Sequence, residues 1–260
     1  MADIEYSVKD RIATIRLNRP AKKNAFTLDM IDRWSEFLIN AKNDSTVRAV
    51  LVTGAGDAFC SGVDLDDLGD FDRRPLTWKS LLADHIYKVV YAMDDMDKVV
   101  VAAVNGIAVG AGMDMALMCD VRYAARSARF SEGYIRIGLV PGDGGCYFLP
   151  RLAGPAAALE LLLTGDFIDA SQAERFGIVN HVVDDDALLE TALEFVTKVA
   201  RHSPLATRMI KRAVYQSLRG DLRTSLDLIS SHMAVVQSTD DAKEALDAFR
   251  QRREPHFEGR

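Results

Sequence analysis

The sequence predicts an α/β protein in which strand–strand–helix (ββα) units stack as a spiral, followed by a helical tail. Residues 47–62 and residues 99–112 both place an apolar strand before a glycine turn. These two segments lie about 50 residues apart, which favours stacked turns of a spiral over one flat sheet. From residue 184 onward the apolar residues recur with helical spacing almost throughout.

The N-terminal part of the chain is expected to alternate strands and loops before its first helix. Two short strands are expected within residues 4–17, where apolar and polar residues alternate. Thr27 is the expected N-cap of a helix with one apolar face, formed by Ile31, Trp34, Leu38 and Ala41. A strand follows at residues 47–53, and the glycine turn within residues 54–65 is expected to open a second helix.

The central unit spans residues 99–120. Its apolar run from Val99 to Val104 is too continuous for a strand with one solvated face, so we expect a strand buried on both sides. Gly110 and Gly112 permit a tight turn, and the helix predicted after it carries Asp114 as its only early charge. Such a turn at a helix N-terminus points free backbone N–H groups at one place. That place suits an anion, either bound or developing during a reaction.

The later elements lead to an amphipathic tail. They are expected in this order: a loop at 71–77, a helix at 78–93, a strand at 121–124, an extended segment at 130–138 and a turn at 141–145 before a further helix. The clearest apolar face of the tail consists of Leu222, Leu226, Ile229, Met233 and Val236. We expect this tail to fold back on the core and also to pack against another subunit.

Composition excludes several classes of protein. The 260 residues are 48% hydrophobic and 27% charged, as in ordinary soluble proteins. A net charge of −6 argues against nucleic acid or an anionic membrane as the main partner. The N-terminus resembles no signal peptide, and no apolar run approaches the roughly 20 residues of a membrane helix. Cys60, Cys119 and Cys146 are expected to be reduced thiols, so we expect a cytoplasmic protein.

Common cofactor and nucleophile motifs are missing from the sequence. Gly110-Ala111-Gly112 has Met115 where the dinucleotide fingerprint requires a third glycine. No phosphate-binding Gly-Lys-Ser/Thr loop and no Gly-x-Ser-x-Gly elbow occur. The five histidines lack ligand spacing, so no metal site is expected. Two glycine turns with acidic residues near them remain as the candidate chemistry.

Several motifs together resemble the crotonase (enoyl-CoA hydratase/isomerase) family. They run in the family's order from about residue 11 to residue 258 and comprise Asn24-Ala25, residues 58–65, residues 105–120, Pro141-Gly142 with Gly144-Gly145, Leu163-Thr164-Gly165 with Ala173, residues 177–180 and residues 244–257. The resemblance implies a crotonase-like spiral core over residues 1–195 and a C-terminal helical region, residues 196–260, that forms homotrimers or dimers of trimers. It also implies coenzyme A thioester substrates, with no permanently bound cofactor.

The resemblance also assigns backbone roles. By position, the N–H groups of Val63 and Ala111 form an oxyanion hole for the thioester oxygen, where one donor is worth roughly 3–4 kcal/mol. The expected coenzyme A contacts are Lys22, Lys23, Ala25, Asp64, Leu65 and Asp66. Alternatively, Lys22 and Lys23 are solvated surface lysines, and Asp64 caps the helix expected after it.

The acidic residues decide the reaction. Family hydratases use two glutamates, and the first maps to Asp114, as in the dienoyl-CoA isomerase branch. The second maps to Tyr134, which cannot replace a carboxylate base near neutral pH. Asp143 and Glu132 lie near that position in the sequence and are candidates to compensate. The alternatives are a helix-dipole role for Asp114, a turn role for Asp143 and a substrate-lining phenol at Tyr134.

We therefore expect an acyl-CoA enzyme of the hydratase/isomerase type that stabilises a thioester enolate. Its catalytic candidates are Asp114, Tyr134 and Asp143. Double-bond migration needs only one base and an oxyanion hole, so isomerase chemistry fits more directly than hydration by a lyase. The alternatives are a CoA-thioester hydrolase that cleaves C–C or C–halogen bonds and a non-catalytic acyl-CoA-binding relative.

Overall fold

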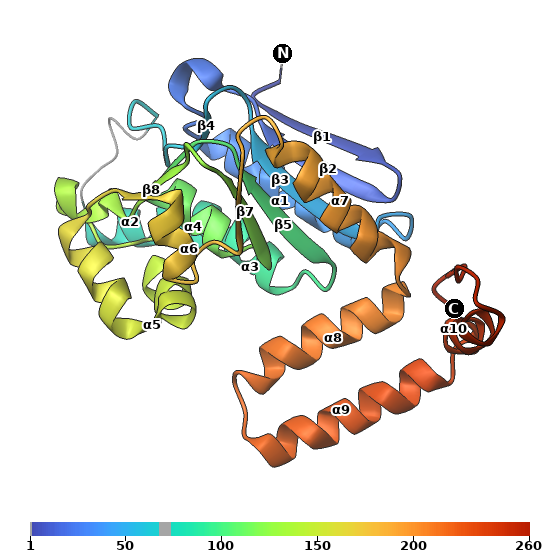
Figure 1. The fold of residues 1–260 in the computed structure, drawn as a ribbon. Helices are drawn as coiled ribbons and strands as arrows, with labels where there is room; N and C mark the ends of the chain where they lie inside the picture. The colour runs from blue at the N-terminus through green and yellow to red at the C-terminus, as the bar shows by residue number, and fades with distance from the viewer. Residues whose placement is uncertain (1, 68–73) are drawn as a thin grey trace.

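The computed structural model describes residues 2–67 and 74–260, and it contains two sheets joined by a repeating chain path (Figure 1). The first sheet has the order β1-β2-β3-β5-β7-β10, made of Ile4–Lys9, Ile12–Leu17, Ala49–Gly54, Val99–Val104, Val121–Ala125 and His181–Val183. The second has the order β4-β6-β8-β9, made of Ala58–Cys60, Ile107–Val109, Arg129–Ser131 and Ile168–Asp169. Pairing is parallel except between β1 and β2 and between β8 and β9.

The spiral is visible in how consecutive strands divide between the sheets. In the pairs β3/β4, β5/β6 and β7/β8, the first strand joins the six-stranded sheet and the second joins the four-stranded sheet. Helical segments follow each pair, so every turn of the spiral is a ββα unit. The spiral predicted from the sequence is confirmed. Because the strands are parallel, the turns that follow β4 and β6 come to the same end of the second sheet.

Helices cover the sheets and form the tail. The α-helices are α1 Leu28–Asn43, α2 Pro75–Leu81, α3 Tyr87–Asp94, α4 Ala111–Leu117, α5 Gly145–Thr164, α6 Ala170–Arg175, α7 Leu188–Arg201, α8 Pro204–Ser217, α9 Leu222–Gln237 and α10 Asp240–Gln251. A π-helical turn, Leu82–Ile86, joins α2 to α3, and 3₁₀ turns occur at Pro20–Lys22 and Gly133–Ile137. As predicted, the Thr27 hydroxyl accepts the Met30 N–H at the start of α1.

Two local expectations are wrong. Residues 62–67 form a bridge and turns instead of a helix, because Phe26 accepts the Asp64 N–H and donates its own N–H to Gly62. The segment 130–138 is extended only to Ser131 and then forms a 3₁₀ turn. The expected loop at 71–77 lies partly outside the described residues, and helix α2 already begins at Pro75.

Helix α5 is long and apolar enough to cross a membrane by length and composition alone. Gly154 interrupts it with φ 78°, and Pro150 and Pro155 flank this kink. The kink leaves two segments that are each shorter than the roughly 20 residues needed to span a bilayer. Length and composition are therefore weak grounds for a membrane span here.

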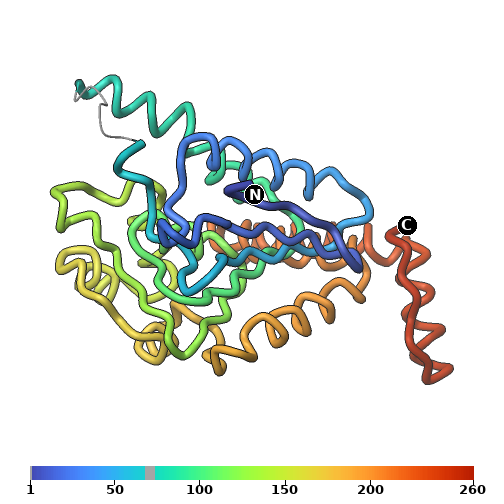
Figure 2. The backbone as a smooth tube through the Cα atoms, turned by 90° about the horizontal axis from the view of Figure 1, so that it is seen from above, coloured from blue at the N-terminus to red at the C-terminus, as the bar shows by residue number. Residues whose placement is uncertain are grey.

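The tail leaves the core after α7, and α8 and α9 run antiparallel as a pair (Figures 1 and 2). Lys211 of α8 reaches the core through an ion pair of 2.7 Å with Asp120. The apolar face expected on the tail is largely solvent-exposed in the single chain, with Leu222 73% and Leu226 55% exposed. This face is therefore not buried on the chain's own core.

Candidate active site

Two backbone turns meet at one end of the second sheet. A Cβ added to Gly62 would lie 3.0 Å from the Val109 carbonyl oxygen and 3.6 Å from the Ala111 nitrogen. A Cβ on Gly112 would lie only 2.1 Å from the Cys60 carbonyl oxygen. Glycine at both positions therefore lets the turn after β4 and the start of α4 pack against each other.

The N–H groups of Val63 and Ala111 are free of acceptors within the described residues. Their neighbours are occupied, since Asp64 donates its N–H to Phe26 and Gly110 donates to Ser131. Ala111 is the first residue of α4, where no intrahelical acceptor exists. Two unused donors on adjacent turns are what an oxyanion site requires.

A cluster of buried acids lies beside these turns. The Tyr134 Oη lies 2.7 Å from Asp114 Oδ2 and 2.6 Å from Asp143 Oδ2. Asp114 is 0% and Asp143 5% exposed. The Tyr134 ring also lies 3.6 Å from the position of a Cβ on Gly110, the residue before Ala111. The structure thus brings all three catalytic candidates together next to the α4 turn.

The cluster cannot be fully ionised with these contacts. A phenol has one hydrogen, so Tyr134 donates to only one of the two aspartates. The other short contact requires a proton on the second carboxyl group. Burial and the nearby Asp143 raise the pKa of Asp114 to about 7, and burial raises the pKa of Asp143 to about 6. One shared proton near neutral pH agrees with these shifts.

Glu132 is a fourth member of the cluster. It is 1% exposed, and a Cβ on Gly145 would lie 3.0 Å from its Oε2 and 2.5 Å from Asp114 Oδ1. Neither Glu132 oxygen has a hydrogen-bond donor within the described residues. Burial, followed by the charge of Asp114, raises the pKa of Glu132 to about 10. A protonated Glu132 would convert its contact with Asp114 into a hydrogen bond.

Glu132→Gln is expected to raise the free energy of unfolding relative to the parent, increasingly as the pH rises. The folded-state pKa of Glu132 lies above its unfolded value, so ionisation favours the unfolded chain between about pH 4.5 and about pH 10. A neutral glutamine lacks this penalty, and we expect a gain of at least about 1 kcal/mol at pH 8.5 relative to pH 5. Urea unfolding at both pH values measures it. Glu190→Gln, at an exposed site, is the control and should give equal differences at the two pH values.

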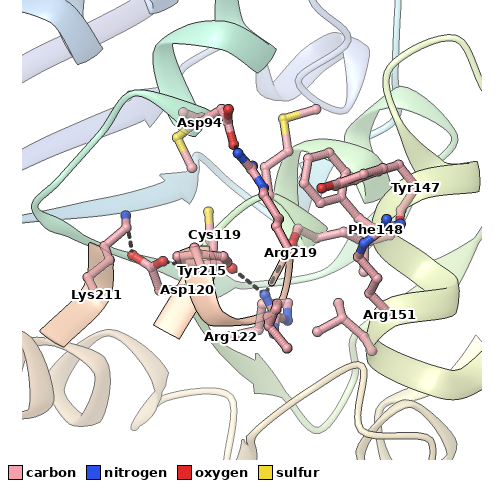
Figure 3. Close-up of a pocket in the computed structure, with 15 residues that line it drawn as sticks. Asp94, Cys119, Asp120, Arg122, Tyr147, Phe148, Arg151, Lys211, Tyr215 and Arg219 are labelled. Atoms are coloured by element: carbon pink, nitrogen blue, oxygen red, sulfur yellow. Dashed lines mark hydrogen bonds and ion pairs between the residues drawn. The ribbon is translucent and has the colours of Figure 1, made fainter. Parts of the chain in front are cut away.

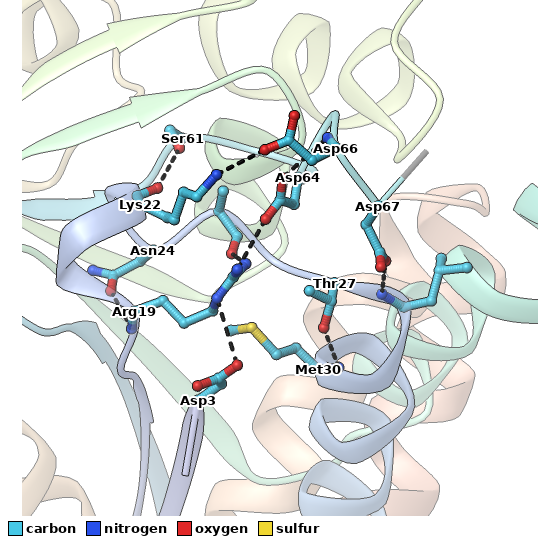
Figure 4. A network of polar contacts seen from close by, with 12 residues as sticks. Asp3, Arg19, Lys22, Asn24, Thr27, Met30, Ser61, Asp64, Asp66 and Asp67 are labelled. Atoms are coloured by element: carbon cyan, nitrogen blue, oxygen red, sulfur yellow. Dashed lines mark hydrogen bonds and ion pairs between the residues drawn. The ribbon is translucent and has the colours of Figure 1, made fainter. Parts of the chain in front are cut away.

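The expected coenzyme A residues form a second group around two loops (Figure 4). The Ser61 N–H donates to the Lys23 carbonyl, which brings the basic loop beside residues 61–66. Lys22 pairs with Asp66 at 2.7 Å, and Lys23 pairs with Asp57 at 2.5 Å. Both lysines are exposed and lie at the loop edge.

The other expected coenzyme A residues differ in burial. Ala25 and Asp64 are buried, whereas Leu65 is 59% exposed. Asp64 pairs with Arg19 at 2.9 Å rather than capping a helix, and its carboxylate also accepts the Asp66 N–H. Arg19 itself donates to the Ala25 carbonyl at 2.7 Å. The sequence did not predict Arg19 as a member of this group. Its backbone N–H donates to the side chain of the buried Asn24, and this hydrogen bond helps to hold the loop in its fold.

Comparison with known proteins identifies the family. The family model described as Enoyl-CoA hydratase/isomerase matches residues 7–260. The chain belongs to the enoyl-CoA hydratase/isomerase family. It is 35% identical to 1,2-epoxyphenylacetyl-CoA isomerase of Escherichia coli over 97% of each chain, and 35% identical to 2,3-dehydroadipyl-CoA hydratase of the same organism over 100% of each.

Solved structures of the family share the whole fold. An enoyl-CoA hydratase from Bacillus anthracis superposes with a TM-score of 0.95 at 32% identity and covers 100% of both chains. The crotonase resemblance drawn from the sequence motifs is thereby confirmed. The protein is an acyl-CoA-processing enzyme of the hydratase/isomerase type.

Proposed function

We propose that the enzyme moves a carbon–carbon double bond within the acyl group of an enoyl-CoA thioester, through an enolate. The observation that carries this proposal is the shared contact of Tyr134 with Asp114 and Asp143. One ionised carboxylate removes a proton from carbon, and the electron pair moves into the thioester carbonyl. A proton then returns at another carbon, and the double bond has shifted. No water is consumed.

The enolate oxygen would be held by the N–H groups of Val63 and Ala111. Negative charge grows on this oxygen during proton removal, so preorganised donors lower the barrier by roughly 3–4 kcal/mol each. Two observations support this role: a Cβ on Gly62 would lie 3.6 Å from the Ala111 nitrogen, and neither amide has an acceptor in the part of the chain that the structure describes. Ala111 opens α4, so the helix dipole favours the same charge.

Asp114 would be the base. The Tyr134 hydroxyl, which contacts both carboxyl groups, would pass the proton on to Asp143 or retain it. Raised carboxyl pKa values near 6 and 7 suit proton exchange with carbon acids near neutral pH better than an ordinary aspartate does. Glu132, which is buried beside Asp114, would act as a positioning residue for it. Hydration is less well supported, because Tyr134 stands where the family's second glutamate maps.

Coenzyme A would bind along the loops of Figure 4. Lys22 and Lys23 would exchange their exposed partners, Asp66 and Asp57, for phosphate oxygens. The residues Ala25, Asp64, Leu65 and Asp66 would line the nucleotide through the backbone next to Val63. The acyl group would extend toward the π-helical turn, where a Cβ on Gly142 would lie 3.2 Å from Leu82.

The reaction is tested with 3-enoyl-CoA and 2-enoyl-CoA substrates in water enriched in ¹⁸O. We expect interconversion of the two positional isomers, with no ¹⁸O in the product. Faster formation of ¹⁸O-labelled 3-hydroxyacyl-CoA would identify a hydratase and overturn the proposal. Release of free coenzyme A with a labelled acid would identify a hydrolase and would also overturn it.

Tyr134→Phe is expected to lower kcat by roughly 10–100-fold, since it removes a hydrogen bond to a charged group at the reacting cluster. The phenol also lowers the pKa of Asp114 and Asp143 by hydrogen bonding. Without it both pKa values rise, so the acid limb of the kcat/KM profile should move to higher pH. Tyr91→Phe, at an exposed site, is the control. An unchanged profile in Tyr134→Phe would contradict the relay.

The tail would form a homotrimer or a dimer of trimers. The boundary of the tail was expected between residues 195 and 196, which falls inside α7. In this proposal the oligomerisation region therefore begins at residue 202, directly after α7.

The double variant Leu226→Glu with Met233→Glu should be a monomer by light scattering, because both charges enter the exposed α9 face. Leu189→Glu on α7 should leave the assembly intact. A monomeric parent protein would contradict this assignment.

The reducing cytoplasm is the proposed location. Cys60, Cys119 and Cys146 are all free thiols. Burial raises the pKa of Cys60 and Cys119 to about 12, which keeps both unreactive. The acyl-CoA thioester is the proposed partner, and a membrane or nucleic acid is not part of the proposal.

A further inference from the structure

A cavity lies at the C-terminal end of α4, where α3, α5 and α8 meet (Figure 3). Its volume is about 160 Å³, and none of its lining residues belongs to the carboxyl cluster or to the coenzyme A loops. Six apolar side chains line it: Met93, Leu117, Met118, Phe148, Leu152 and Leu218. An engineered apolar cavity of about 150 Å³ holds benzene, so a ring of that size fits here.

The charged residues around the cavity are unbalanced. Lys211 pairs with Asp120 at 2.7 Å, and Arg219 pairs with Asp94 at 2.6 Å. Arg122 and Arg151 also line the cavity, and neither has an ion pair with an acid within residues 2–67 and 74–260. Among the described residues, the cavity therefore has two arginines that no carboxylate contacts, although Asp120 is near enough to Arg122 to favour its charged form.

Arg122 is the unusual member of this group, because it is only 2% exposed. Its Nε donates to the Ile178 carbonyl and its Nη1 to the Cys119 carbonyl, both at 2.5 Å. Its Nη2 has no acceptor among the described residues. Burial lowers the pKa of Arg122, and the nearby charge of Asp120 offsets only part of this effect. A carboxylate on Nη2 would supply both the acceptor and the charge.

Arg151 reaches the cavity from α5. The carbonyl oxygen of the next residue, Leu152, lies 3.3 Å from the position that a Cβ on Gly177 would take. Gly177 directly precedes Ile178, whose carbonyl accepts a hydrogen bond from Arg122. Arg151 itself donates to the Tyr147 carbonyl at 2.7 Å, and its guanidinium lies 3.4 Å from the Tyr147 ring centre. Helix α5 therefore packs against the loop that carries Ile178, and it holds a second guanidinium, that of Arg151, at the cavity.

We propose that this cavity binds a small organic carboxylate with an apolar body, at a site separate from the thioester site. The carboxylate would meet Arg122 Nη2, and the body would lie among the apolar side chains. An inorganic anion would leave the apolar walls unfilled, and a hydrocarbon would leave Arg122 without an acceptor. A benzoate-sized acid satisfies both requirements.

The probe for the test is 4-fluorobenzoate, titrated into the full-length protein and followed by ¹⁹F NMR. Fluorobenzene tests the body without the charge, and inorganic phosphate tests the charge without the body. We expect saturable binding of 4-fluorobenzoate, at least about tenfold tighter than that of either comparison ligand. Saturating coenzyme A should leave this binding unchanged, which separates the cavity from the thioester site.

Two variants at exposed positions test the location without disturbing the core. Arg151→Met removes one cation, and Leu218→Trp fills the cavity from α8, so each should weaken 4-fluorobenzoate binding at least about tenfold. Arg126→Met, at an exposed arginine paired with Asp184, is the matched control and should bind as the parent does. The proposal is overturned by any of three results: no saturable binding, displacement by coenzyme A, or parent-like binding by both cavity variants.

Discussion

Asp114→Asn is expected to lower kcat for double-bond migration by roughly 10²–10⁴-fold, the range for loss of a general base. Asparagine keeps the size of Asp114 and its place between Tyr134 and Glu132, but it cannot accept a proton from carbon. Binding of a non-reactive acyl-CoA should stay within about threefold of the parent, because the base contributes mainly to the transition state. Steady-state kinetics and calorimetric titration measure the two effects.

The same variant should be more stable than the parent at alkaline pH. Burial raises the pKa of Asp114 above its unfolded value, so ionisation of this group between about pH 4 and about pH 7 costs folding stability. Asparagine removes that cost, so lost activity cannot be ascribed to unfolding. Asp227→Asn, at an exposed site on α9, is the control for both measurements. Full activity in Asp114→Asn would refute the assignment of the base.

Gly112→Ala is expected to destabilise the fold by roughly 3 kcal/mol and to lower kcat/KM by at least about tenfold. The added Cβ would lie 2.1 Å from the Cys60 carbonyl oxygen and 2.6 Å from its carbon, so backbone must move. Overpacking of this kind costs roughly 1–3 kcal/mol, more where backbone is displaced. Movement here separates β4 from α4, and with them Val63 from Ala111.

The control for this experiment is Gly220→Ala. A Cβ there has its nearest contact at 3.7 Å, and the φ of Gly220 is not in the left-handed region. We expect Gly220→Ala to keep parent activity and stability within about 0.5 kcal/mol. If Gly112→Ala kept full activity, the two turns would not need their close contact, and the oxyanion proposal would fail.

Some members of the carboxyl cluster are predictable from the sequence, whereas the contact that joins them is not. Asp114 and Asp143 were identifiable because each lies beside a glycine turn that opens a helix. That Tyr134 joins the two aspartates was not predictable, since the chain between residues 130 and 138 was expected to be extended. The 3₁₀ turn at Gly133–Ile137 redirects Tyr134, and buried contacts between distant segments determine such turns.

The arginines of the cavity in Figure 3 are a second feature that the sequence does not predict. Its two arginines that lack an ion pair among the described residues are 29 positions apart in the numbering of the chain, on β7 and α5. Nothing in the local sequence around Arg122 distinguishes a buried arginine from an ordinary strand residue. It is buried against the end of α4 and the loop at Ile178, where the carbonyl oxygens of Leu117, Cys119 and Ile178 accept its N–H groups.

The ββα spiral, the turn at residues 110–112 and the family are predictable from the amino-acid order alone, because hydrophobic periodicity and required glycines are local properties of the chain. The charge states of the acids are not predictable in this way. A pKa depends on burial and on neighbours that are distant in sequence, as when Glu132, Tyr134 and Asp143 converge on Asp114. The missing helix after Gly62 has the same cause, since the loop at Phe26 takes the hydrogen bonds that a helix would have used.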